Sequence, residues 1–170
     1  MRKQKGFSLI ELLIVVAIIL IIAAIAIPNL LRAKIAANES SAAASVRTLV
    51  TANIEYSTSY PAAGYAANIA SLGPTASTGC TTPSSTNACI IDWVLSQGTK
   101  SGYILASTGS SAVGTANTQF VASATPQNAN TTGVKGFCAQ EDGVVRYENP
   151  ASSKETTYGS GGCGGLSAMQ

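Results

Sequence analysis

Residues 7–27 read FSLIELLIVVAIILIIAAIAI and are followed directly by Pro28. Every residue from Leu12 to Ile27 is apolar, and only Ser8 and Glu11 are polar before that. As an α-helix this stretch rises about 31 Å, which matches the roughly 30 Å hydrocarbon core of a bilayer. The stretch therefore predicts a transmembrane helix, and the rest of the chain has to be organised around it.

The residues before this stretch are basic. Arg2, Lys3 and Lys5 are three of the ten Lys and Arg residues of the chain, which leaves seven basic against eight acidic side chains elsewhere. Positive charge immediately before an apolar run is the positive-inside signature of a membrane segment. A nucleic-acid-binding surface would need a basic face with aromatic residues, and the sequence shows none.

Two other interpretations of the apolar stretch fit less well. A cleaved secretory signal peptide has an apolar region of about 7–15 residues, whereas this one continues into Ile27-Pro28 and a further helical pattern. A plain membrane anchor has no need of a carboxylate near the start of its span, where an ionisable group is costly and usually functional. Cleavage after Gly6 would create an amine at Phe7. Between staggered chains that amine and Glu11 would fix the register, because a mismatch leaves a charge unpaired.

The segment Lys5-Gly6-Phe7-Ser8-Leu9-Ile10-Glu11-Leu12 resembles the class III signal sequence of type IV prepilins and the related pseudopilins. The resemblance is specific because the Gly-Phe pair, the glutamate and Pro28 all fall in the register of that family. It implies that a prepilin peptidase cuts after Gly6 on the cytoplasmic side and N-methylates Phe7. It also implies that Glu11 is needed for assembly. The rest of the chain has no motif of comparable strength.

The helical pattern resumes after Pro28, which lacks an amide hydrogen and should kink or loosen the helix. Apolar residues then recur at spacings of four or seven, namely Leu31, Ile35, Ala42, Val46, Val50 and Ile54. Tyr60-Pro61 is the predicted stop, because a residue before proline avoids the helical region. We expect one bent helix of about 80 Å from Phe7 to Ser59, apolar all round in its first half and amphipathic in its second.

The region after the helix is expected to be an α+β head. Residues 61–88 are rich in Gly, Ser, Thr and Pro and predict a long loop, and residues 89–97 predict a short helix. Strands are expected over residues 102–107, 119–125, 136–140 and 144–147, the last entered through the turn Glu141-Asp142-Gly143. Three or four antiparallel strands packed on the helix give this fold class. The resemblance implies the same architecture, with a sheet lying on the C-terminal half of the long helix.

The chain has four cysteines, Cys80, Cys89, Cys138 and Cys163. An even number of cysteines behind a membrane-insertion signal indicates disulfides formed in an oxidising compartment. Of the three pairings that four cysteines allow, we favour Cys80–Cys89 and Cys138–Cys163, because short loops close most easily. In pilins a disulfide-bounded C-terminal loop commonly forms the exposed surface, and the segment from Asn149 resembles one.

The sequence predicts no active site, no cofactor and no metal site. It has no histidine, the usual base for nucleophilic catalysis, and no Cys-x-x-Cys spacing for zinc. A calcium site at Glu141 and Asp142 stays open as an alternative, because some secretion pseudopilins resemble that arrangement. Asn38-Glu39-Ser40 and Asn130-Thr131-Thr132 match the N-glycosylation pattern, although the first lies within a predicted helix.

Together these features predict a structural subunit of a type IV pilus used for adhesion, motility or DNA uptake, and not an enzyme. Its expected parts are a cleaved leader (1–6), a transmembrane and assembly helix (7–28), an amphipathic continuation (29–60) and a head (61–170). The resemblance implies that its partners are copies of itself in a helical homopolymer, the cytoplasmic membrane, a prepilin peptidase and an assembly platform. The precursor would cross the inner membrane once, and the mature chain would lie in an extracellular filament.

Two alternatives remain from the sequence. One is a pseudopilin of a type II secretion or competence system, which uses the same N-terminal segment in a short fibre. Two disulfides and a cysteine-bounded tail favour the pilus subunit over the pseudopilin, judged by the habits of the family. The presence of Glu11 favours a subunit that can join the shaft, since minor pilins often depart at that position. The other alternative is a membrane-anchored binding module, whose ligand, DNA or a surface, the sequence does not name.

Overall fold

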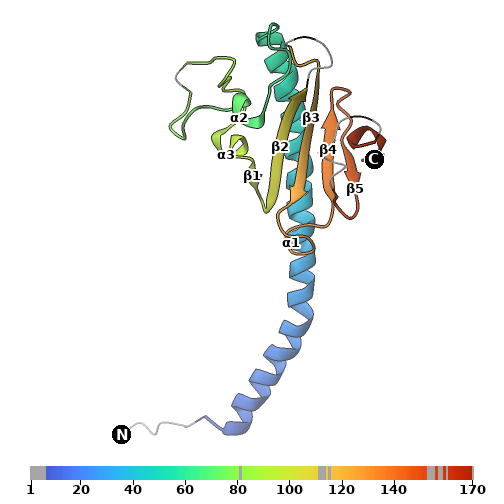
Figure 1. Cartoon of the computed structure of the whole chain (residues 1–170). Coiled ribbons are helices and arrows are strands. Elements are labelled where there is room, and N and C mark those ends of the chain that lie inside the picture. Colours follow the sequence, from blue (N-terminus) through green and yellow to red (C-terminus); the bar gives the residue numbers. More distant parts are fainter. Residues whose placement is uncertain are drawn as a thin grey trace. The chain divides into compact units, whose positions relative to one another are not determined.

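The computed structural model describes residues 7–80, 82–110, 114, 116–152, 156, 159 and 161–169. The chain divides into two compact units, Met1–Lys34 and Ile35–Gln170, and each is described by itself. Helix α1 (Leu9–Ser59) provides residues to both units (Figure 1). It ends at Ser59, as Tyr60-Pro61 predicts, and it begins two residues after the predicted start at Phe7.

The described part of the first unit is helical from Leu9 onward and has no interior of its own. Its apolar side chains are exposed, and an 18-residue window reaches a mean hydropathy of 3.3 with none of its residues buried. By length and composition it suffices to cross a membrane. Pro28 lies inside the helix without ending it, although its ring nitrogen cannot donate to the carbonyl of Ala24. One residue later, Asn29 Nδ2 donates to the carbonyl of Ile25 at 3.1 Å.

In the head, the buried face of α1 differs in part from the predicted one. Val46 and Val50 are buried as expected, whereas Ile54 is 48% exposed and Leu31, which belongs to the first unit, is 57% exposed. A strict four-residue spacing turns about 40° around the helix at each step, so it leaves the buried face within three steps. The observed face alternates steps of four and three instead: Ala42, Val46, Leu49, Asn53 and Tyr56.

A six-stranded antiparallel sheet covers this face of α1, with the strands in the order β1-β2-β3-β4-β5-β6 (Figure 1). The α+β class is therefore confirmed, with more strands than expected. Four strands correspond to predicted ones, with their ends moved by up to three residues, whereas the two-residue edge strands β1 and β6 were missed. The strands are β1 (Thr99–Lys100), β2 (Tyr103–Ser110), β3 (Gln119–Pro126), β4 (Gly136–Gln140), β5 (Arg146–Glu148) and β6 (Ser167–Ala168).

Two predictions between α1 and the sheet were correct only in part. The expected loop of residues 61–88 contains a short helix, α2 (Ile69–Leu72), and the expected helix of residues 89–97 is only α3 (Trp93–Ser96). The side chain of Asn68 accepts a hydrogen bond from Ser71 N, and that of Asp92 accepts one from Leu95 N. These are N-cap contacts, which set where each helix begins.

The core of the head joins α1, the short helices and the sheet. Its largest fully buried apolar side chains are Tyr103, Phe120, Leu49, Leu72 and Leu95. The structure contains the two disulfides that the sequence favoured, Cys80–Cys89 and Cys138–Cys163. The second joins β4 to η2 (Cys163–Gly165) in a small separate cluster with Val121, so the C-terminal segment is tied to the sheet.

Candidate processing and assembly segment

The sequence predicts Phe7 as the new N-terminus. Phe7 lies before the first turn of α1 and is 84% exposed. Gly6 and the leader charges Arg2, Lys3 and Lys5 lie outside the described residues, so cleavage after Gly6 and methylation of Phe7 stay predictions.

Glu11 has a role at the start of α1 that the sequence reasoning missed. Ser8 N donates to Glu11 Oε2 at 2.9 Å, and Leu12 N donates to Ser8 O at 3.3 Å. Ser8 is thus the residue before the helix and Glu11 is three residues later, which is the spacing of a capping box, S-x-x-E. The signal was present in Ser8-Leu9-Ile10-Glu11. A carboxylate here also interacts favourably with the positive end of the helix dipole. Glu11 therefore stabilises its own helix as well as being available to a partner.

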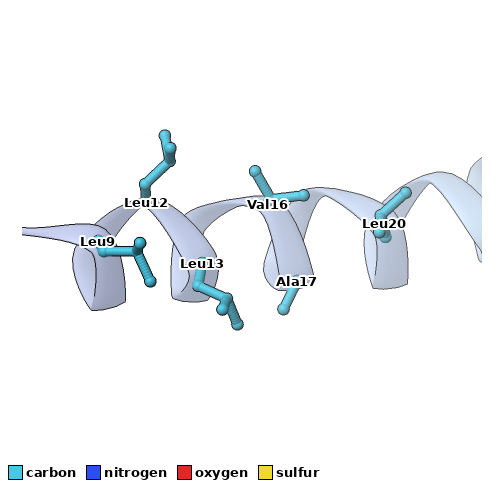
Figure 2. A pocket seen from close by; sticks show the side chains of 6 residues that line it. All are labelled: Leu9, Leu12, Leu13, Val16, Ala17 and Leu20. Carbon is cyan, nitrogen blue, oxygen red and sulfur yellow. The ribbon is translucent and has the colours of Figure 1, made fainter.

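The apolar helix has a shallow hollow on its surface near Glu11. Figure 2 shows the side chains that line it: Leu9, Leu12, Leu13, Val16, Ala17 and Leu20. Ala17 is the short side chain among five larger ones, and small residues let helices approach closely in an apolar setting. A continuous exposed apolar surface of this kind marks a site of contact with lipid or protein.

In the head, α1 is fastened to the loop before β4 by two neighbouring polar side chains. Asn38 Nδ2 donates to Thr132 O at 2.9 Å, and Glu39 Oε1 accepts from the backbone N–H groups of Val134 and Lys135 at 3.1 and 3.2 Å. Lys135 Nζ lies 3.7 Å from Glu39 Oε2. The amide of Asn38 is therefore engaged within the fold.

Burial, with a smaller contribution from the charge of Glu39, raises the pKa of Tyr103 well above its usual value.

The acidic turn that left a calcium site open is paired with an arginine. Arg146 Nη2 donates to Asp142 Oδ2 at 2.6 Å, and Val144 N donates to Asp142 Oδ1 at 3.0 Å. The hydrogen bond from Arg146 lowers the pKa of the Asp142 carboxyl below its usual value. Within the described ranges no group of three or more His, Cys, Asp or Glu side chains is placed to hold a metal ion.

The comparisons with known proteins match parts of the chain. Residues 1–27 match the family described as the prokaryotic N-terminal methylation motif. Over 40 residues the chain is 65% identical to the type IV wide pilus major component PilA4 of Thermus thermophilus. These residues make up 24% of this chain and 30% of that protein. Over 50 residues it is 50% identical to the type IV major pilin protein PilA of Myxococcus xanthus, 29% of this chain and 23% of that protein.

Each match covers less than a third of the relative. No solved structure matches the chain significantly. The similarity to these pilus proteins therefore rests on less than a third of this chain.

Proposed function

We propose that this chain, whose N-terminal segment is that of the type IV pilin family, is a structural subunit of a type IV pilus filament. The observation that carries the proposal is the first half of α1. It is apolar all round, exposed along its length, and preceded by a segment that matches the N-terminal methylation motif. A helix with no polar face cannot remain in water, so it needs lipid or other copies of itself.

The proposed mechanism follows from the charges at the two ends of the apolar run. In the precursor, Arg2, Lys3 and Lys5 keep the N-terminus on the cytoplasmic side of the inner membrane. Cleavage after Gly6 by a prepilin peptidase removes these charges and creates an amine at Phe7. In the filament, Glu11 then neutralises the amine of a neighbouring copy in a medium of low dielectric constant, where an unpaired charge is costly.

The exchange of lipid for helix contacts supplies the attraction between copies. Side chains such as those in Figure 2 leave the bilayer and pack against the same segment of neighbouring chains. The assembly platform that would extract the chain is a partner by inference from the family. A pseudopilin of a secretion or uptake system would use the same steps. The two relatives are both major pilus proteins, which favours the pilus subunit.

The experiment that tests the proposal is to shear the surface of cells that make this protein and pellet the released material. The intact mass of the pelleted chain is then measured with and without reductant. We expect a chain that begins at methylated Phe7 and gains four hydrogens on reduction of its two disulfides. The same processed chain confined to the membrane fraction would indicate a pseudopilin, and an uncut chain would defeat the proposal.

A further inference from the structure

Two opposite charges on the head part of α1 have no partner among the described residues. The side chains of Arg47 and Glu55 are both exposed, and in the described part of the molecule neither forms a hydrogen bond or an ion pair. Other charged groups of the head are engaged, among them Glu39 with Lys135 and Asp142 with Arg146. Arg47 and Glu55 are eight residues apart, or about 12 Å along the helix axis and about 80° around it, which is too far for a contact on one helix.

The surface between these charges is suited to close approach by another chain. Its threonines use their hydroxyls internally: Thr48 Oγ1 donates to Ala44 O at 3.1 Å, and Thr51 Oγ1 donates to Arg47 O at 3.2 Å. Thr58 Oγ1 likewise donates to Ile54 O at 3.0 Å. Covering this face would therefore leave none of these hydroxyl donors without an acceptor. An unsatisfied donor is the usual cost of burying a polar group. The side chains are also short, apart from Ile54, which is 48% exposed.

We infer that this face receives a second copy of the chain, displaced by about 12 Å along the helix axis, so that Arg47 of one copy pairs with Glu55 of the next. The inference rests on the proposed function, since it requires a polymer of parallel copies. An arginine and a carboxylate are the two groups that pair best, because the guanidinium can donate two parallel hydrogen bonds. The described residues of the head provide both groups unpaired on one helix.

The positions of the two residues also fit an open polymer. Because the copies are parallel and each is displaced in the same direction from the last, Arg47 of one copy meets Glu55 of the next, and its own Glu55 is left for the copy before it. Contacts of this kind are heterologous and continue from copy to copy instead of closing a dimer. The apolar half of α1 would supply most of the attraction, and the ion pair would set the axial register, since exposed pairs give specificity more than affinity.

Charge reversal in cells that make the full-length protein tests the pairing. Arg47→Glu and Glu55→Arg should each lower the yield of sheared filaments by about tenfold or more, because like charges then face each other at every contact. The double variant should restore most of the yield. Lys100→Glu, which reverses an exposed cation on β1, is the matched control and should assemble normally. The intact mass of membrane-held protein, with both disulfides formed, verifies folding of each variant.

A thiol pair gives a direct readout of the contact. After treatment with a short bis-maleimide, which bridges cysteines too far apart for a direct disulfide, filaments of the variant carrying both Arg47→Cys and Glu55→Cys should run as a ladder of covalent multimers, whereas either single variant should not. If the double charge reversal restores nothing, or if the thiol pair gives no ladder, the pairing is wrong even though filaments form. If the unaltered protein forms no filaments at all, it is the proposed function that fails.

Discussion

A carboxylate and a carboxamide can both accept the hydrogen bond that Ser8 N donates to Glu11 Oε2 at 2.9 Å, but only the carboxylate carries a charge. The variants Glu11→Gln and Glu11→Ala therefore separate the two roles of this residue. If neutralisation of the Phe7 amine is what assembly needs, both variants should be cleaved after Gly6 and both should lose their sheared filaments. The cleaved N-terminus is read by mass and the filaments by pelleting. Normal filaments from Glu11→Gln would mean that the helix cap alone is required.

The ion pair at the β4–β5 turn predicts a local dependence on pH. The hydrogen bond from Arg146 lowers the pKa of Asp142, so the folded state gains stability above the ordinary carboxyl pKa of about 3.9 and loses it as the pH falls through the lower folded value. Arg146→Met should return the pKa of Asp142 to its ordinary range, as measured by an NMR titration of the carboxyl carbon. The Asp142 side chain is 43% exposed, so we expect little change in overall stability. An unchanged pKa in Arg146→Met would contradict the pairing.

At the scale of elements, α1 is held in the head by a narrow set of side chains. Leu49 is fully buried against the sheet, and Ile54, five residues on, is 48% exposed. Leu49→Ala should lower the free energy of unfolding of the head by about 2–5 kcal/mol through the cavity it leaves, and Ile54→Ala by much less. Denaturant unfolding of the full chain in detergent, with the disulfides intact, measures both. Equal losses would show that the buried face of α1 is assigned incorrectly.

The elements that the sequence predicts well are those with a long or regular pattern. The apolar run and the Tyr60-Pro61 stop define α1 to within two residues at its start, and β4 has the predicted bounds because all five of its residues are buried. Strands β1 and β6, with two residues each, are too short to show an alternation. The short helices α2 and α3 each begin at a single capping residue, Asn68 or Asp92. Side chains of this type can form several alternative hydrogen bonds with the nearby backbone, so the sequence does not show which one forms.

The candidate site could be predicted only where its signal is local. Glu11 stands out as a lone carboxylate in an apolar run, and the capping box with Ser8 is readable from a spacing of three residues. The bond from Asn38 to Thr132 joins residues 94 positions apart, and no pattern in one sequence encodes it. The proposed partner of Glu55 lies in another copy of the chain, so neither the sequence nor a single chain displays it.

At the scale of the whole molecule, the two units depend on different sources of stability. Residues 7–34 bury almost nothing within the chain and acquire an interior only from lipid or from other copies. The head has its own core, in which eight of the twenty buried residues that the structure describes are alanines. An alanine buries less apolar area than a larger side chain and gives less hydrophobic stabilisation, so the two disulfides should add measurably to the stability of the head.

The two disulfides should therefore differ in how much each stabilises the head. Cys138 and Cys163 are fully buried with Val121 and close a separation of 25 residues, whereas Cys80–Cys89 closes a separation of 9 in a largely exposed loop. The loop-entropy relation gives about 3.5 kcal/mol for the first and about 2.6 kcal/mol for the second, and loss of buried sulfur contacts widens the gap. Replacing each pair by alanine and measuring denaturant unfolding of the full chain in detergent tests this order. A larger loss from the Cys80–Cys89 pair would mean that the exposed loop, which Tyr56 also ties to α1 through its hydrogen bond to Ser85 O at 2.5 Å, contributes more to the head than its burial indicates.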